Sequence, residues 1–236
     1  MFSRVLRFCI LIPLLWAAPL QAGAPLRIIT VGDSITRGAG VKSGENFAAV
    51  LEKRLVEKGY SCELTNAGIG GDTADALKRL QGGVIAKKPD LVTVMYGTND
   101  SYVPKGATQS RNSLVEYEAG LRKMVAALKE AGIQPVLMTS PPWAEGAPLD
   151  GAGQNPNVSL TGYIEVCRKV AKDMHVPLVD HFAHWIAAAK QGVKLKSWTS
   201  DFCHPNPVGH QQMADEILKV VFPLVEKLSK RKDSEN

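Results

Sequence analysis

The chain has 236 residues, of which 45% are hydrophobic, 22% charged and 6% aromatic. This composition is typical of one globular domain of ordinary size, and it excludes a disordered chain, a collagen-like fibre and a disulfide scaffold. The formal net charge of +5 comes mainly from the two ends, so the body, residues 25–226, is nearly neutral. A nearly neutral body has no basic stripe, and we expect no nucleic-acid partner.

The N-terminal segment has the features of a cleaved secretory signal. Arg4 and Arg7 precede a short apolar stretch over residues 8–18, and small residues follow it. The apolar stretch is too short to cross a bilayer as a helix, so we expect no stable membrane span. We therefore predict a secretory signal peptide over residues 1–24 and a secreted or periplasmic location for the rest of the chain.

The body alternates short apolar runs with helical periodicities. The runs are rich in β-branched residues, which is typical of strands that are covered on both faces. We predict strands over residues 26–31, 62–65, 91–96, 135–139 and 176–179. The second of these has the weakest pattern. Between them, apolar residues recur at helical spacing and are assigned to the core. These helical stripes are Phe47–Leu55, Leu114–Leu128 and Tyr163–Met174.

A last helix is predicted near the C-terminus. It begins with Asn206 as its cap and Pro207 in its first turn, and we expect it to bend or end at Pro223. Repeated strand–helix–strand units predict one α/β domain over residues 25–226, with a parallel sheet and helices on both faces. Residues 227–236 are predicted to form a basic polar tail.

Small and polar residues follow the predicted strands. Ligands of a parallel sheet bind beyond the carboxyl ends of its strands, so these segments are the candidates for a functional site. They are Gly32–Thr36, Asn66–Thr73, Gly97–Asp100 and the Gly-, Pro- and Asn-rich segment Ser140–Asn157. We expect all of them to meet at one rim of the sheet.

A serine, a histidine and an aspartate in these loops fit nucleophilic catalysis. A nucleophilic serine needs a base to take its proton, a group that orients the base, and donors for the oxyanion. Ser34 follows the first strand on a glycine turn, and Asp201 and His204 lie three residues apart in one loop before the last helix. The N–H groups of Ser34 and Gly71 and the side-chain amide of Asn99 are candidate oxyanion donors.

These segments, in this order, resemble the four signature blocks of the GDSL, or SGNH, hydrolase family. The blocks are Gly32–Thr36, Asn66–Thr73, Gly97–Asp100 and Asp201–His204. The resemblance implies a flavodoxin-like three-layer α/β/α sandwich whose five parallel strands lie in the order 2-1-3-4-5. It also implies hydrolysis of esters or thioesters without a cofactor.

The resemblance assigns roles by position within the blocks. It makes Ser34 the nucleophile, Asp201 and His204 the orienting acid and the base, and Gly71 and Asn99 the partners of the Ser34 N–H in the oxyanion hole. The first block reads GDSIT where the family name implies GDSL, which changes no catalytic position. The second block contains three glycines, and Gly71 is the one that directly precedes Asp-Thr.

Each residue also has a reading without catalysis. A Gly-Asp-Ser triplet alone is typical of a turn, Asp201 and His204 could form a local hydrogen-bonded pair, and Asn99 could cap a turn or a helix. His181 and His184, with Cys203 and His204, could form a zinc site. His181 and His184 lack the glutamate of an H-E-x-x-H motif, so we predict no metal.

The cysteines leave two possibilities open. If the signal is removed, Cys62, Cys167 and Cys203 remain. They permit either one disulfide and one free thiol or three buried thiols.

The expected activity is that of a serine esterase which hydrolyses carboxylic esters through an acyl-enzyme. Export favours short acyl groups, such as O-acetyl, on small molecules or glycans. The loop Trp143–Asn157, with Tyr96, Tyr102 and Trp198, could line a pocket for a sugar or an aromatic alcohol; packing of these rings is the alternative. Two other functions stay open: a lysophospholipase or thioesterase for longer acyl chains, and a non-catalytic glycan-binding module.

Overall fold

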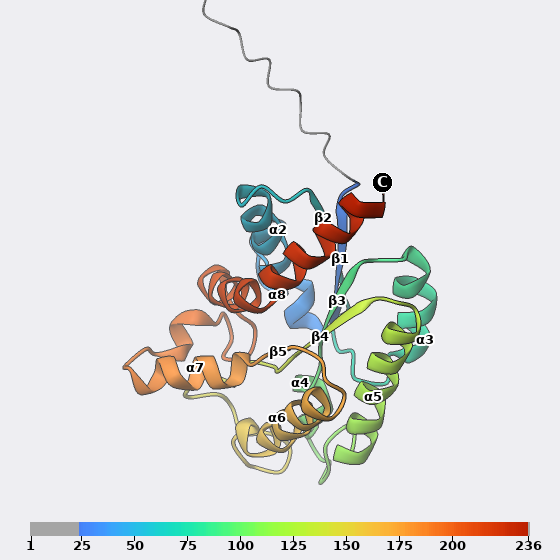
Figure 1. Cartoon of the computed structure of the whole chain (residues 1–236). Helices are drawn as coiled ribbons and strands as arrows, with labels where there is room; N and C mark the ends of the chain where they lie inside the picture. The colour runs from blue at the N-terminus through green and yellow to red at the C-terminus, as the bar shows by residue number, and fades with distance from the viewer. Residues whose placement is uncertain (1–23, 236) are drawn as a thin grey trace, which may run out of the picture.

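The computed structural model describes residues 24–235, so the predicted signal peptide lies outside the described residues except for its last position. The chain forms one sheet of five parallel strands in the order β2-β1-β3-β4-β5, with helices on both faces (Figure 1). The predicted fold class, strand number and strand order are confirmed. The strands are β1 (Leu26–Gly32), β2 (Cys62–Gly68), β3 (Leu91–Met95), β4 (Gln134–Met138) and β5 (Leu178–Val179).

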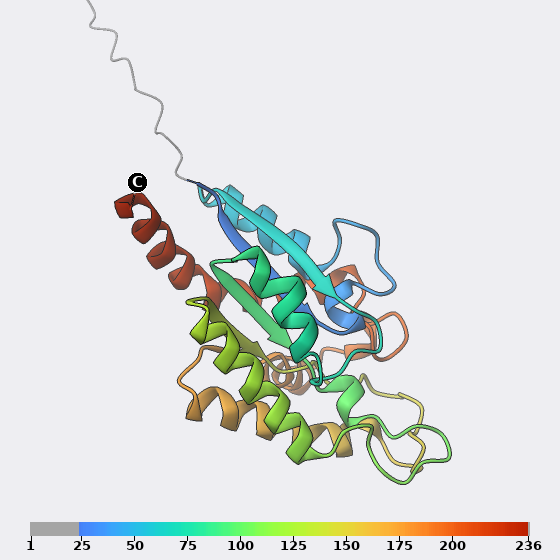
Figure 2. The same cartoon turned by 90° about the vertical axis from the view of Figure 1, so that its right-hand side faces the viewer.

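The helices form two layers, one on each face of the sheet (Figures 1 and 2). One layer holds α3 (Leu77–Arg79), α5 (Leu114–Glu130) and α6 (Pro156–Asp173), and the other holds α2 (Phe47–Glu57), α7 (His181–Lys190) and α8 (Pro207–Glu235). Two short helices, α1 (Ser34–Arg37) and α4 (Thr98–Ser101), follow strand ends. The remaining elements are a short π-helix, η1 (Leu80–Val84), and two 3-10 helices, η2 (Ile85–Lys87) and η3 (Leu195–Trp198).

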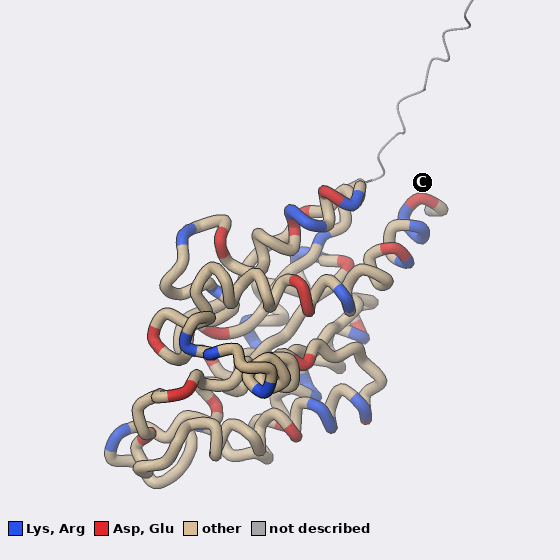
Figure 3. The backbone as a smooth tube through the Cα atoms, turned by 90° about the vertical axis from the view of Figure 1, so that its left-hand side faces the viewer, with Lys and Arg blue, Asp and Glu red and all other residues tan. Residues whose placement is uncertain are grey.

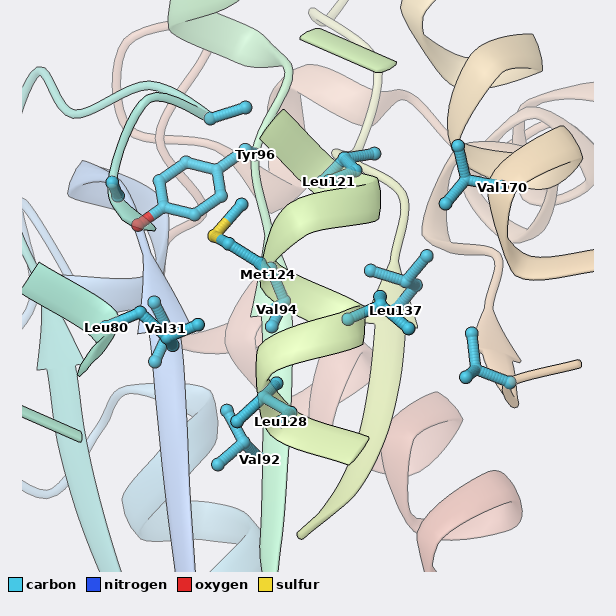
Figure 4. Packing of buried hydrophobic residues seen from close by; sticks show 14 of the residues in the cluster. Val31, Leu80, Val92, Val94, Tyr96, Leu121, Met124, Leu128, Leu137 and Val170 are labelled. Carbon is cyan, nitrogen blue, oxygen red and sulfur yellow. The ribbon is translucent and has the colours of Figure 1, made fainter. Parts of the chain in front are cut away.

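The strands contribute side chains to two separate hydrophobic cores. In β3, Val92 and Val94 belong to the core beneath α3, α5 and α6, whereas Leu91 and Met95 belong to the core beneath α2, α7 and α8. This alternation follows from the two-residue period of a strand. Figure 4 shows the first core, with α5 packed over β3. Because both faces are covered, all five residues of β3 are buried, which explains its continuous apolar pattern.

The two edge strands differ from the prediction. β2 continues to Gly68, beyond the predicted end, and its side chains at Glu63 and Thr65 are exposed. With one face open, β2 alternates half-buried and exposed residues and has no continuous apolar run, which is why its pattern is weak. At the opposite edge, β5 contains only Leu178 and Val179.

The C-terminal helix also departs from the prediction. α8 passes through Pro223 and reaches Glu235 over 29 residues, so of the two expected effects of Pro223, a bend or an end of the helix, the end is wrong. Proline removes one backbone hydrogen bond, but Val221 and Val225 are fully buried on either side of it. Their packing keeps the helix continuous, and the predicted polar tail forms its last turns. Helix α7 was not among the predicted helices, although His181, Trp185 and Ala188 form its buried face.

Charged residues are distributed over the surface. In Figure 3, basic and acidic residues are interspersed along the backbone. No helix within residues 24–235 combines the length and the apolar character that crossing a membrane requires.

Two glycines allow the ends of β1 and β2 to approach α1 closely. A Cβ atom on Gly32 would lie 2.2 Å from Thr36 Oγ1 and 2.5 Å from the Met95 carbonyl oxygen. A Cβ atom on Gly68 would lie 2.3 Å from the Arg37 backbone nitrogen. The side chain of Asn66 joins the same elements, since its Nδ2 donates to the Thr36 carbonyl at 2.6 Å. The helix that carries Ser34 is therefore held directly against the sheet.

We predict that Gly68→Ala destabilises the protein by about 1–3 kcal/mol, because its new methyl group meets backbone atoms that cannot move independently. The measurement is chemical unfolding followed by circular dichroism. Gly82→Ala is the control, since a Cβ atom there meets nothing within 4 Å. Equal stability of the two variants would contradict the prediction.

Candidate active site

Ser34 is the first residue of α1, the one-turn helix that follows β1. Asp33 caps this helix, because its Oδ1 accepts a hydrogen bond from the Ile35 N–H at 2.9 Å. Gly38 ends the helix in the left-handed conformation. This strand–cap–helix junction presents the partly exposed Ser34 side chain at the carboxyl edge of the sheet.

His204 and Asp201 come from the loop between η3 and α8, at the other end of the chain. His204 Nε2 lies 2.9 Å from Ser34 Oγ, and its Nδ1 lies 2.7 Å from Asp201 Oδ2. The other carboxylate oxygen of Asp201 accepts the backbone N–H groups of Cys203 at 3.1 Å and His204 at 2.8 Å. Phe202, between them, has φ +73°, a strained conformation that this turn maintains. The structure therefore joins the three predicted residues in one hydrogen-bonded chain.

The loop also determines the charge of Asp201 and the tautomer of His204. Partial burial raises the pKa of Asp201, but hydrogen bonds from the backbone and imidazole of His204 and from the Cys203 N–H outweigh it, so the pKa lies below its usual value. An ionised carboxylate favours the imidazole tautomer with its proton on Nδ1. Nε2 of His204 is then free to accept the Ser34 hydroxyl proton.

The three candidate oxyanion donors lie on loops that contact one another. The N–H groups of Ser34 and Gly71 donate to no other group among residues 24–235. The Asn99 amide donates to Asp33 Oδ2 at 3.3 Å and to the Asp72 carbonyl at 3.1 Å. Asn99 thus connects the Ser34 junction with the Gly71 loop, and a substrate oxygen has to replace one of its two acceptors.

A buried carboxylate, Asp100, holds the surrounding loops together. Asp100 is fully buried, and it accepts hydrogen bonds from the Ala74 N–H at 2.9 Å, the Gly97 N–H at 3.0 Å and Asn112 Nδ2 at 2.8 Å. Burial raises the pKa of Asp100, and these three donors oppose that rise. Asp100 lies in a signature block, but this supporting role was not predicted, because two of its three partners are distant in the chain.

A second polar cluster, which sequence analysis missed, supports the Gly71 loop. Asp72 forms an ion pair with Arg79 and accepts the Tyr96 hydroxyl at 3.0 Å. Arg79 also donates to the Ala67 carbonyl at 3.2 Å. The spacing of these residues shows no motif that would have predicted the cluster.

The four aromatic residues expected to line a pocket divide into two groups. Tyr96 is only 1% exposed and belongs to the core, and Trp198 packs edge-on against Trp185 with ring centres 5.1 Å apart. The alternative, packing, describes Tyr96, whereas for the half-buried Trp198 the pocket role stays a prediction. Tyr102 and Trp143 instead stack on each other at the surface, with centres 6.4 Å apart and an interplanar angle of 21°. They remain candidates for ligand contact.

The histidines and cysteines outside the Ser34 site have structural surroundings. His181 is fully buried, and burial lowers its pKa to about 3. Within residues 24–235, no three His, Cys, Asp or Glu side chains are arranged to hold a metal ion. Of the two possibilities for the cysteines, the structure has three free thiols, of which Cys167 and Cys203 are buried and Cys62 is half-buried. Burial raises the pKa of Cys62 to about 11 and that of Cys167 to about 12.

Comparisons with known proteins identify the family of the chain. Residues 30–212 match the GDSL-like Lipase/Acylhydrolase family. The "Isoamyl acetate-hydrolyzing esterase 1 homolog" of Rattus norvegicus is 29% identical over 215 residues, which cover 85% of this chain and 82% of that protein. The "Uncharacterized lipoprotein YqeF" of Bacillus subtilis (strain 168) is 30% identical over 184 residues, which cover 68% of this chain and 72% of that protein.

Solved structures show the same fold. A catalytic mutant of Axe2, described as an acetylxylan esterase from Geobacillus stearothermophilus, superimposes with a TM-score of 0.69 at 26% sequence identity. The match covers 84% of this chain and 94% of that chain. The similarity therefore extends over nearly the whole α/β domain.

One acidic group beside Ser34 makes the stability of the fold depend on pH. Complete burial raises the pKa of Asp33 to about 7; the Ile35 N–H lowers it in part, and the nearby Asp100 raises it further. In the unfolded chain this pKa is about 3.9. The folded state therefore binds the proton more tightly, and the stability that Asp33 contributes is complete below about pH 4 and is lost as the pH rises to about 7.

We predict that the stability of the wild type relative to Asp33→Asn decreases as the pH rises. The expected decrease is on the order of 3 kcal/mol between pH 5 and pH 8, at about 1.4 kcal/mol per pH unit below the folded pKa. Urea unfolding of both proteins across this range measures the difference. A difference that stays constant with pH would show that Asp33 is ionised throughout.

Proposed function

Because the chain belongs to the GDSL-like lipase/acylhydrolase family and is a carboxylic ester hydrolase, we propose that it uses Ser34 to remove short acyl groups, acetyl above all, from small molecules or glycans. The observation that carries this proposal is the hydrogen-bonded chain from Ser34 through His204 to Asp201. No cofactor takes part in the proposed reaction.

In the first half-reaction His204 acts as the base. Its Nε2 takes the proton from Ser34 Oγ while Oγ attacks the ester carbonyl carbon, and Asp201 stabilises the resulting imidazolium. The carbonyl oxygen becomes an oxyanion, for which the N–H groups of Ser34 and Gly71 and the Asn99 amide are the proposed donors. The intermediate collapses when the C–O bond breaks and the imidazolium gives its proton to the departing alcohol.

The second half-reaction repeats these steps with water. His204 takes a proton from a water molecule, the hydroxide attacks the acyl-enzyme carbonyl, and the acid leaves as Ser34 recovers its proton. The Asn99 amide must exchange an acceptor each time an oxyanion forms. Its bond to Asp33, at 3.3 Å, is the longer of the two, so we propose that this one is exchanged.

The preference for acetyl esters and the cellular location are both more specific than carboxylic ester hydrolysis and are part of the proposal. Support for acetyl comes from the relatives, one named for isoamyl acetate hydrolysis and one for acetylxylan. We also propose that the protein is exported, since the N-terminal sequence has the features of a signal and a relative is named as a lipoprotein.

We predict that Ser34→Ala and His204→Ala each lower kcat by a factor on the order of 10⁶, and that Asp201→Ala lowers it by roughly 10⁴. The losses follow because the three residues act as one unit. The measurement is hydrolysis of p-nitrophenyl acetate, with the melting temperature confirming that each variant is folded. Ser61→Ala, at an exposed serine just before β2, is the control and should leave the rate unchanged.

A different result would favour the non-catalytic alternative. Folded wild-type protein that does not hydrolyse p-nitrophenyl acetate and does not react with a fluorophosphonate probe would contradict the proposal. A glycan-binding module would then be the better description.

We further predict that kcat/KM is highest for acetate in a series of p-nitrophenyl esters from acetate to octanoate. The same series on Ser34→Ala corrects for background hydrolysis. A maximum at octanoate would refute the preference for short acyl groups and favour the lysophospholipase or thioesterase alternative, while leaving the serine mechanism intact.

A further inference from the structure

A separate polar cavity lies beside the proposed active site, at the same end of the sheet. Its volume is about 630 Å³, within the range of ligand-binding sites. It lies between two segments, residues 103–116 and 150–163, which belong to the loops that project at lower right in Figure 2. Neither the proposed triad nor the oxyanion donors line it.

The walls of this cavity are joined by specific hydrogen bonds. The Gly151 N–H donates to the Val103 carbonyl at 2.9 Å, and a Cβ atom on Gly151 would lie 1.8 Å from the Pro104 carbonyl oxygen. Ser159 Oγ lies 3.2 Å from Ser110 Oγ and donates to the Ser101 carbonyl at 2.8 Å. The cavity is thus preformed, which reduces the ordering cost of binding.

Polar side chains at the cavity have no partner within the protein. The side chains of Thr108, Gln109, Arg111 and Gln154 line the cavity and make no hydrogen bond or ion pair with any of residues 24–235. Amide and hydroxyl groups of this kind both donate and accept hydrogen bonds. They match a ligand that carries many hydroxyl groups.

The charged and apolar groups of the lining further restrict the class of ligand that fits the cavity. Arg111 is the one basic residue of the lining, and two carboxylates, Glu116 and Asp150, accompany it. This balance favours a neutral ligand over a strongly charged one. Val158, an apolar residue of the lining that is 64% exposed, supplies surface on which the C–H face of a pyranose ring can pack.

Two chains of contacts connect the cavity with the proposed active site. Asn112, in the lining, bonds to Asp100, the neighbour of Asn99. On the other side, Val103 adjoins Tyr102, which stacks on Trp143. The next residue, Ala144, donates to the Phe202 carbonyl at 2.8 Å, in the loop of His204. The aromatic pair Tyr102–Trp143 therefore lies between the cavity and the His204 loop.

We propose that this cavity binds a sugar unit of an acylated oligosaccharide, at a distance from the ester that Ser34 cleaves. The inference rests on the proposed function and specifies its substrate. The saccharide runs from the Ser34 site across the Tyr102–Trp143 pair, and its distal unit bonds to Gln109 and Gln154. Sugar chains long enough to reach the cavity are then better substrates than single sugars.

The test compares acetylated xylose, acetylated xylobiose and acetylated xylotetraose. For the wild type, kcat/KM is expected to rise with chain length, mainly through a lower KM. In the double variant Gln109→Ala/Gln154→Ala, the advantage of xylotetraose over xylose should fall about tenfold, the effect of losing two neutral hydrogen bonds. Gln191→Ala, an exposed glutamine at the end of α7, is the matched control and should keep the full advantage.

Three outcomes would overturn the inference. Wild-type kcat/KM that does not depend on chain length, or no deacetylation of any of the sugars, would refute it while p-nitrophenyl acetate hydrolysis shows that the esterase function stands. The same holds if the double variant keeps the wild-type chain-length advantage. Absence of Ser34-dependent p-nitrophenyl acetate hydrolysis would instead contradict the proposed function, and this inference with it.

Discussion

The structure depends on the requirement that a parallel sheet be covered on both faces. Each strand is followed by a crossover that returns over one face through a helix, so the carboxyl ends of all strands meet at one edge. Here this edge receives the end of β1 with Ser34, the end of β2 with the Gly71 loop, and the end of β3 with Asn99. The loop that precedes α8 adds His204 to the same edge. Residues far apart in the sequence become neighbours because the sheet has no other stable way to bury its surfaces.

This edge contains more buried polar groups than a hydrophobic core tolerates without compensation. Asp33 and Asp100 are both buried close to Asn99, and an unpaired carboxylate in such a position would be costly. Their oxygens instead accept hydrogen bonds from backbone and side-chain donors of several loops. The same bonds that compensate burial also hold the loops in position. Rigidity of the proposed site is thus a consequence of burying its acids.

Whether a feature can be predicted from the sequence depends on how far apart in the chain the interacting residues lie. β3 has a strong pattern in the sequence because both of its faces are buried, whereas β2, at the edge, has a weak one. Ser34, Asp201 and His204 were predicted because each lies in a local motif, and the structure brings them into hydrogen-bonding distance. The support given by Asp100, and the cluster of Asp72 and Arg79, depend on contacts that no local pattern records. Pro223 shows the opposite case, since tertiary packing of α8 keeps the helix from ending at a residue that locally favours an end.

The separation of Ser34 and His204 along the chain affects when activity can arise. The two residues are 170 positions apart, and His204 directly precedes the last helix. In the proposed mechanism, a polypeptide that is still being synthesised therefore contains its nucleophile without its base. Catalytic competence comes only when α8 has docked on the finished sheet. The enzyme is therefore inactive until synthesis and folding are complete.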